Sequence, residues 1–283
     1  MNPPLARGEA KPDGNGNGAP GEHLLALRGF SKSFGPVRAL HEVDFEVDSG
    51  EIVAMVGDNG AGKSTLIKAI DGVGPPDSGE AYFEGKKVKI STPQIAERLG
   101  IATVFQDLAL CENLDVVANI FLGKELNPLR LDEVAMEIRA WTLLNELSAR
   151  IPSVREAVAS LSGGQRQTVA IARSLLLEPK LILLDEPTAA LGVAQTAEVL
   201  NLIDRVRERG LGVLMISHNM EDVRAVADRI VVLRLGRNNG VFEPDASNQE
   251  LVSAITGAAN NSVSRRAGRR QAERGQSQQG LQP

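Results

Sequence analysis

Cysteine is almost absent from this 283-residue sequence, in which Cys111 stands alone. One cysteine excludes an internal disulfide and a multi-cysteine metal site, and we expect Cys111 to be a small packed residue. Long hydrophobic runs are also missing, because runs such as 175–177 and 181–184 fall far below the roughly 18–20 apolar residues that cross a bilayer. The first twenty residues hold no apolar segment of a signal peptide. We therefore expect a cytoplasmic chain that meets a membrane only through a partner.

The sequence also lacks an excess of positive charge. Its formal net charge is −5, so no overall positive field recruits nucleic acid, and no nucleic-acid partner is expected. Hydrophobic residues make up 42% and charged residues 24% of the chain. This is the composition of a globular protein with a sizeable core.

Three regions differ in composition. Residues 1–22 are rich in Gly, Pro and Asn and predict a disordered tail. Residues 258–283 are polar and basic and predict a second disordered tail; weak adhesion of its arginines to anionic lipid is the alternative. Residues 23–257 form one globular region without an internal repeat. The basic tail contains Arg265, Arg266, Arg269, Arg270 and Arg274 beside one acid, Glu273.

Within the globular region, strand and helix patterns alternate. Residues 43–47 alternate apolar with acidic and predict a half-buried strand. The apolar runs 52–56, 181–184 and 213–216 predict buried strands, a helix follows from 66, and the apolar spacing of 199, 202, 203 and 206 predicts another helix. Such alternation indicates an α/β fold with a largely parallel sheet. Residues 108–162, with helical spacing over 134–147, predict a helical insert.

A glycine-rich loop follows the strand predicted at 52–56 and opens a helix. It matches G-x-x-x-x-G-K-[ST], a phosphate-binding loop. Glycines let the backbone approach phosphate oxygens, since a Cβ would collide. Exposed N–H groups and the helix N-terminus attract the anion, the lysine reaches the β- and γ-phosphates, and the first hydroxyl ligates Mg²⁺. A glycine-rich turn alone would not explain this context. The residues are Gly57, Asp58, Asn59, Gly60, Ala61, Gly62, Lys63, Ser64 and Thr65.

Two carboxylates end the apolar strand at 181–184. A strand end of this kind points into the crevice where α/β proteins bind ligands. We predict that Asp185 holds the Mg²⁺ shell and that Glu186 polarises the attacking water as a general base. A merely solvated pair is the alternative, and the phosphate loop upstream argues against it.

A third motif, Leu161-Ser162-Gly163-Gly164-Gln165, lies between the loop and the acid pair. The order of motifs resembles the ATP-binding cassette (ABC) ATPases over about residues 24–257. The resemblance implies a P-loop core with an antiparallel N-terminal β-subdomain and a helical subdomain at about 108–162. It also implies a head-to-tail dimer, either of two copies or with a second ABC ATPase, that holds two ATP molecules between phosphate loops and opposing signatures.

The resemblance assigns further site residues. Phe34 matches the aromatic that stacks on adenine, with a core aromatic as the alternative. Gln106 matches the glutamine that senses Mg²⁺ and the attacking water. His218 matches the histidine that contacts the γ-phosphate, although a lone histidine after a strand is more often structural. Ser162, Gly163, Gly164 and Gln165 match the signature that closes on ATP bound to the other subunit.

One position departs from the family pattern. The segment after the acid pair, usually similar to S-A-L-D, is Ala189-Ala190-Leu191-Gly192 here. The missing carboxylate at Gly192 puts communication between the two sites in doubt, but not nucleotide binding.

Segments 100–110, 114–123, 187–193 and 216–220 are similar to the single-cassette ATPases of simple-sugar importers (ribose, xylose and fructose). The resemblance implies an ATPase at the cytoplasmic face of the cell membrane. Its partners would be integral membrane permease subunits, contacted near Gln106 and the helical insert, and indirectly an extracytoplasmic sugar-binding protein. The alternatives are a non-transport ABC ATPase, an exporter ATPase and a regulatory subunit without turnover.

Overall fold

Two β-sheets and the helices packed on them form the described part of this protein. The structure is a computed structural model that describes residues 23–127 and 130–257. The predicted tails, 1–22 and 258–283, lie outside the described residues. No helix in the described ranges is long and apolar enough to cross a membrane.

The N-terminal part forms an antiparallel sheet of four strands in the order β2-β1-β4-β5. In β2, Val43, Phe45 and Val47 are buried and alternate with polar residues that are not, as the sequence predicts. The expected antiparallel β-subdomain is confirmed. Its strands are β1 (Leu25–Phe34), β2 (Val37–Val47), β4 (Ser78–Phe83) and β5 (Lys86–Val88).

A second sheet has six strands in the order β10-β9-β3-β8-β7-β6. Its pairings are parallel except the one between β9 and β10, which is antiparallel. The three predicted buried strands are confirmed as β3 (Ile52–Val56), β7 (Leu181–Asp185) and β8 (Gly212–Ile216). The remaining strands are β6 (Ile101–Val104), β9 (Arg229–Arg234) and β10 (Arg237–Phe242).

Burial on both faces explains the continuous apolar strands of this sheet. Val53 and Met55 of β3 join the core shared with the N-terminal sheet. Ile52, Ala54 and Val56 join the core on the other face. Helices α1 (Lys63–Ile70) and α2 (Pro93–Leu99) add side chains to the first core, while α5 (Gly163–Leu175), α6 (Val193–Glu208), α7 (Met220–Val226) and α8 (Asn248–Thr256) add side chains to the second.

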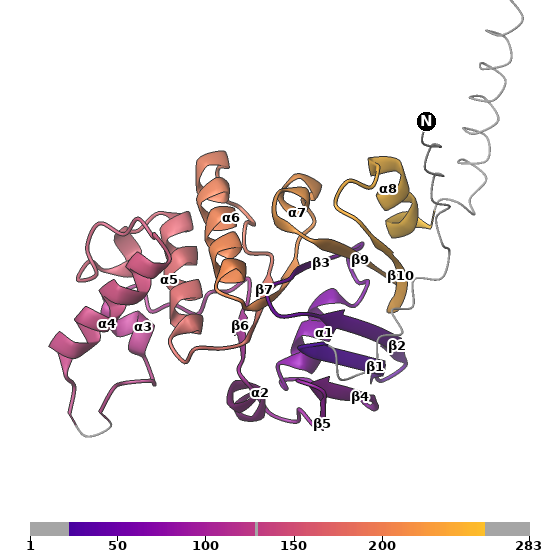
Figure 1. Ribbon diagram of the computed structural model, residues 1–283, viewed down its shortest axis with the longest axis horizontal. Helices are drawn as coiled ribbons and strands as arrows, with labels where there is room; N and C mark the ends of the chain where they lie inside the picture. The colour runs from indigo at the N-terminus through magenta and orange to yellow at the C-terminus, as the bar shows by residue number, and fades with distance from the viewer. Residues whose placement is uncertain (1–22, 128–129, 258–283) are drawn as a thin grey trace, which may run out of the picture.

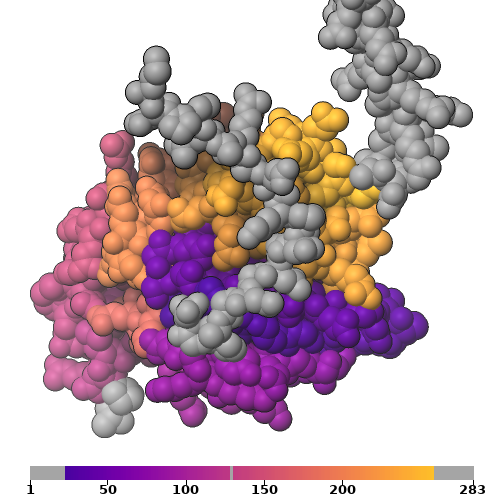
Figure 2. Space-filling view, turned by 45° about the vertical axis from the view of Figure 1, so that its right-hand side comes forward, coloured from indigo at the N-terminus to yellow at the C-terminus, as the bar shows by residue number. Residues whose placement is uncertain are grey.

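The helical insert extends to one side of the sheet (Figure 1). It contains α3 (Val116–Phe121), α4 (Glu133–Glu146) and a 3-10 turn (Val158–Ser160), and the signature helix α5 follows it. The helix predicted over 134–147 is α4, one residue earlier at each end. Figure 2 shows the N-terminal strands at the base of the molecule with the C-terminal elements above them. Asn238 of β10 joins these parts through two hydrogen bonds to the Asp44 backbone.

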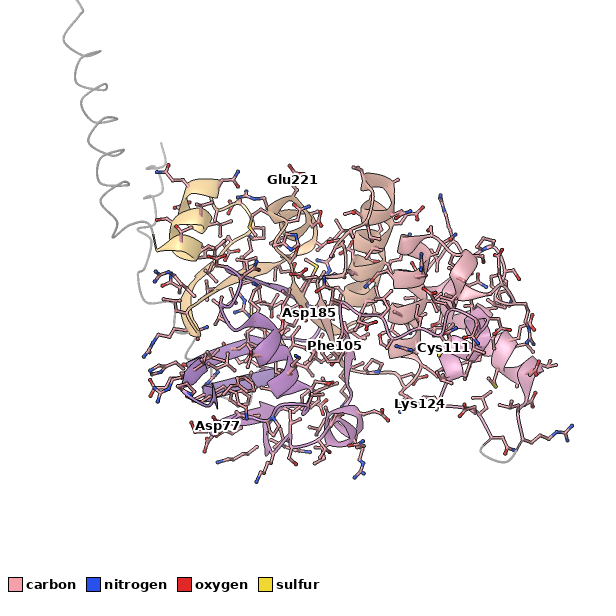
Figure 3. The ribbon with its side chains drawn as sticks, turned by 180° about the vertical axis from the view of Figure 1, so that it is seen from behind. Asp77, Phe105, Cys111, Lys124, Asp185 and Glu221 are labelled. Carbon is pink, nitrogen blue, oxygen red and sulfur yellow. The ribbon has the colours of Figure 1, made fainter. Side chains whose placement is uncertain are left out.

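The carboxyl ends of parallel strands meet at one edge of the sheet, and this edge is where α/β proteins bind ligands. β3 leads into the phosphate loop, β7 ends at Asp185, β8 precedes His218 and β6 precedes Gln106. The fold therefore brings four separate motifs to one edge. Figure 3 labels Asp185 near the centre of the molecule, between the N-terminal sheet and the helical insert.

Candidate active site

The phosphate loop joins β3 to α1, and its glycines have left-handed backbone angles. φ is +78° at Gly60 and +105° at Gly62. A Cβ at Gly62 would lie 2.5 Å from the Ala39 carbonyl oxygen, and one at Gly57 would lie 2.1 Å from the Leu233 carbonyl oxygen. A side chain at Gly57 or Gly62 would therefore collide with the backbone of β9 or β2. The sequence alone did not reveal this reason for glycine.

Helix α1 begins at Lys63, three residues before the expected position. Its N-cap is Gly62, and no side chain caps it, so the first N–H groups are left for an anion. The Lys63 ammonium donates to the Gly57 oxygen at 2.8 Å and the Asp58 oxygen at 3.0 Å. The loop curls around this ammonium, and burial lowers the Lys63 pKa against the opposing effect of Glu186 and Asp185.

Ser64 and Asp185 face each other across the gap between α1 and β7. The Ser64 hydroxyl donates to Asp185 Oδ1 at 3.5 Å. Burial raises the Asp185 pKa, the Ser64 hydrogen bond lowers it, and the Glu186 carboxylate raises it. Within the described ranges, no group of three or more His, Cys, Asp or Glu side chains could hold a metal alone. The hydroxyl and carboxylate oxygens fit Mg²⁺, which usually combines one or two protein oxygens with phosphate and water.

Glu186 and His218 come from adjacent strand ends and form a pair. The Glu186 Oε1 atom lies 3.4 Å from His218 Nδ1, and the exposed fractions of the two side chains are 24% and 67%. Glu186 has φ of +52°, a left-handed conformation that costs energy in a non-glycine residue and clusters at functional sites. Its N–H donates to the Ile216 carbonyl at 3.0 Å, which fixes this bend to β8.

Gln106 is exposed two residues beyond the end of β6. It lines one hollow with Glu186 and with Gly163 of the signature segment. Phe34, at the end of β1, is 56% exposed, so the alternative that it is a core aromatic is wrong. The Lys32 ammonium lies 5.8 Å from the Phe34 ring centroid, within the range of a cation–π contact.

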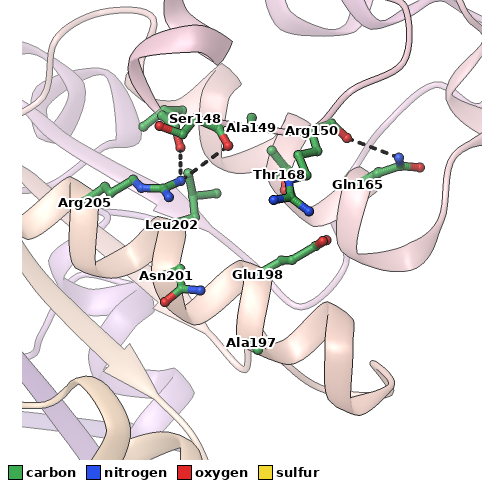
Figure 4. Close-up of a pocket in the computed structure, with 11 residues that line it drawn as sticks. Ser148, Ala149, Arg150, Gln165, Thr168, Ala197, Glu198, Asn201, Leu202 and Arg205 are labelled. Carbon is green, nitrogen blue, oxygen red and sulfur yellow. Dashed lines mark hydrogen bonds between the residues drawn. The ribbon is translucent and has the colours of Figure 1, made fainter.

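The signature segment forms the N-terminus of α5, where the sequence predicted it to precede the helix. Ser162 is the N-cap, and its side chain forms a capping box with Gln165. The Gln165 Nε2 atom donates to the Arg150 oxygen at 3.2 Å, as Figure 4 shows beside the pocket between α5 and α6. Both side chains are therefore bonded within their own subunit, and Gly163 and Gly164 leave their first-turn N–H groups to an anion.

The structure brings the phosphate loop, Asp185, Glu186, His218 and Gln106 to one edge of the sheet. It shows no hydrogen bond between the signature and the phosphate loop in the described ranges, and an opposing copy remains the predicted source of a signature. Sequence reasoning missed Thr188, Asn219 and Asp222, which lie in one hollow with Glu186 and His218. Their polar character beside two functional positions was the only available signal.

The sequence and the fold of this chain are similar to those of known proteins. The family model described as ABC transporter matches residues 40–189. The chain belongs to the ABC transporter family. A xylose/arabinose import ATP-binding protein of Sulfolobus acidocaldarius is 50% identical over 233 residues, which cover 82% of this chain and 93% of that protein. A fructose import ATP-binding protein of Rhizobium meliloti is 47% identical, over 84% of this chain and 95% of that protein.

A ribose import ATP-binding protein of Rubrobacter xylanophilus is 41% identical over 89% of this ABC chain, but the match spans only 50% of that relative. The resemblance to simple-sugar importer ATPases is confirmed by these relatives. Among solved structures, an ATP-binding cassette of an ABC transporter in its ADP conformation matches with a TM-score of 0.72 and 27% identity, over 83% of this chain and 95% of that one.

A dimeric bacterial ABC transporter cassette also matches, with a TM-score of 0.67 and 26% identity, over 79% of this chain and all of that one. The P-loop ABC ATPase fold is therefore confirmed. The chain binds ATP and is an ATP hydrolase of the ABC type.

Proposed function

We propose that this chain hydrolyses Mg-ATP in a head-to-tail dimer, at the cytoplasmic face of a membrane, and drives import of a simple sugar through a permease. The observation that carries the enzymatic part is the meeting of Ser64 with Asp185 and of Glu186 with His218 at neighbouring strand ends. The names of the relatives, which import xylose, arabinose, fructose and ribose, support the sugar class.

Each residue of the site has a distinct task. The loop N–H groups and Lys63 hold the phosphates, and Phe34 offers an exposed ring face to adenine. Ser64, Asp185 and the Gln106 amide oxygen would hold Mg²⁺, which supplies charge neutralisation on the transferred phosphoryl group. Glu186 accepts a proton from the attacking water, and His218 donates a hydrogen bond toward the γ-phosphate.

The signature completes the site from the opposite subunit. The N-terminus of α5, with the exposed Ser162 and the first-turn N–H groups of Gly163 and the buried Gly164, suits the γ-phosphate of ATP on a second copy. In this proposal hydrolysis requires two chains, and the match to a dimeric ABC transporter cassette supports dimerisation.

The permease contact is supported by a surface groove beside Gln106. Residues of α2, β6 and α5 line it, together with Phe105, Leu108 and Leu177 from the segments that follow β6 and α5. Leu122 at its rim is followed by further exposed apolar side chains along the helical insert, and exposed apolar patches of this kind mark interaction surfaces. The side chains beyond Leu122 are Leu126, Leu131, Val134 and Ile138.

The test is ATP hydrolysis by the purified chain beside Glu186→Gln. We expect turnover by the wild type, and for the variant a loss of about a hundredfold or more, because its amide cannot accept the proton. Light scattering should show that the variant with Mg-ATP accumulates as a dimer. Turnover by neither protein, even with the permease present, would refute the proposal.

The sugar class needs a separate experiment. The chain and its permease, reconstituted in liposomes, should hydrolyse ATP faster when a binding protein loaded with xylose, arabinose, fructose or ribose is added outside. Stimulation by none of these sugars would refute sugar import and leave ATP hydrolysis intact.

A further inference from the structure

A buried carboxylate lies between the segments that follow the two hydrolytic residues. Asp222, in the first turn of α7, is only 6% exposed. Its Oδ2 atom accepts from the Thr188 hydroxyl at 2.6 Å, and its Oδ1 atom accepts from the Asn219 amide at 3.0 Å. Thr188 is two residues beyond Glu186, and Asn219 is the residue after His218. The carboxylate therefore bridges the two loops.

The backbone alone connects these loops weakly. β7 and β8 pair as far as Asp185 and Ile216, and beyond this point the Glu186 N–H bond to Ile216 continues the connection. Beyond that bond, side-chain contacts set the distance between the segments that follow Glu186 and His218. Hydrogen bonds to a desolvated carboxylate are stronger than neutral ones and costly to leave unmade, so Asp222 is suited to this task.

Asn219 uses both the oxygen and the nitrogen of its side-chain amide, so its orientation in the bridge is fixed. Its Oδ1 atom caps α7 by accepting from the Glu221 N–H at 3.0 Å, and its Nδ2 atom donates to Asp222. Reversing the amide would lose the cap and point oxygen at carboxylate. The Ser217 hydroxyl also accepts from the Asn219 N–H at 3.1 Å.

We propose that Asp222 is a positioning residue for ATP hydrolysis: by joining Thr188 to Asn219 it holds Glu186 and His218 at their observed separation. This inference rests on the proposed function of that pair. The Asp222 carboxylate bonds to Thr188 and Asn219 and acts on the Glu186–His218 pair through them. Its loss therefore lowers kcat while the phosphate loop and Phe34, which are untouched, keep the KM for ATP.

Exchanging the two side chains provides the test. Asp222→Asn by itself can keep both bonds, because its amide can turn to accept from Asn219 and donate to the Thr188 hydroxyl oxygen. The disrupting variant is Asn219→Asp, for which we expect kcat to fall about tenfold with KM within about twofold. Asn219→Asp alone sets carboxylate against carboxylate. The double variant, Asn219→Asp with Asp222→Asn, restores a donor–acceptor pair and keeps an oxygen at the α7 cap, so kcat should return.

The matched control is Thr103→Val. It removes another Thr–Asp hydrogen bond, from Thr103 to the buried Asp71 at 2.6 Å, on a strand that backbone pairing holds against β7. Melting temperatures of all variants separate stability from kcat. A loss of stability with unchanged kcat in Asn219→Asp would overturn the proposal, as would a double variant no more active than Asn219→Asp.

Two further measurements test the proposal if a variant fails to fold or if the wild type shows no ATP hydrolysis. If Asn219→Asp fails to fold, Thr188→Val should lower kcat and Thr188→Ser should restore it. If the wild type hydrolyses no ATP, the proposed function fails. The ring resonances of His218, assigned by loss in His218→Gln, then decide this inference: they should shift in Thr188→Val and return in Thr188→Ser, and constant resonances would overturn it.

Discussion

At the scale of single residues, Asp185 combines a functional position with a cost to the fold. Burial places its folded-state pKa above the ordinary value. The folded protein therefore holds this proton more tightly than the unfolded chain, so the charge destabilises the fold at neutral pH. That cost is relieved as the pH falls through the folded-state pKa.

Asp185→Asn should separate the two effects. We expect a higher melting temperature for the apo protein at pH 7, because the buried charge is gone while an oxygen remains for Ser64. The difference should shrink at acid pH, where the wild-type carboxyl is protonated. Mg-ATP hydrolysis should fall about a hundredfold or more. A variant that melts below the wild type at pH 7 would contradict this account; thermal melts at several pH values provide the measurement.

Gly62 shows why the phosphate loop needs glycine before any ligand arrives. In Gly62→Ala the new Cβ meets a backbone oxygen of β2, and we expect a loss of about 2–3 kcal/mol in the free energy of unfolding. Gly60→Ala is the control, since it has positive φ but open space around the Cβ. It should cost only about 1 kcal/mol. Urea denaturation of both variants tests the difference, and equal losses would rule out the clash.

At the scale of elements, α6 begins without a side-chain cap. Its N-cap is Gly192, whose φ is −74° and whose missing Cβ would meet nothing within 4 Å. This is the position where the family pattern has aspartate. The absence of that carboxylate is therefore not forced by crowding in this subunit.

Gly192→Asp should stabilise the chain by a few tenths of a kcal/mol, because aspartate accepts hydrogen bonds at an N-cap and glycine does not. Gly192→Ala is the control and should show no such gain. Denaturation reports the cap, and the dependence of turnover on ATP concentration reports any new coupling between sites. If Gly192→Asp were no more stable than Gly192→Ala, the aspartate would not be capping α6, and this prediction would be contradicted.

At the scale of the whole molecule, the separation of the signature from the phosphate loop predicts sites shared between copies. Lys63→Ala removes the phosphate cation. Ser162→Asp keeps the α5 N-cap, because aspartate caps well, but repels the γ-phosphate. Each variant alone should be inactive, and Ser162→Asn, a neutral cap, should retain more activity than Ser162→Asp.

Mixing the two variants should restore activity. In a mixed head-to-tail dimer one site combines an intact loop with an intact signature, so random pairing should return about a quarter of wild-type turnover. Steady-state hydrolysis across mixing ratios measures this. A mixture as inactive as its components would contradict the shared site.

The apolar runs at 52–56, 181–184 and 213–216 predicted β3, β7 and β8, because strands buried on both faces leave a continuous apolar signal. The motifs beside them predicted the loop, the acid pair and the signature. The N-terminal sheet followed from the family resemblance, since its strands β4 and β5 are short and mostly polar.

Sequence by itself determined which chemical groups the chain carries, because those groups lie in contiguous motifs whose spacing is local. Tertiary structure alone decided which groups meet. The 3.4 Å approach of Glu186 to His218 and the Asp222 bridge join segments more than thirty residues apart. The collision that demands glycine at position 62 comes from β2. Such contacts depend on how strands order within a sheet, a long-range choice that no local pattern records.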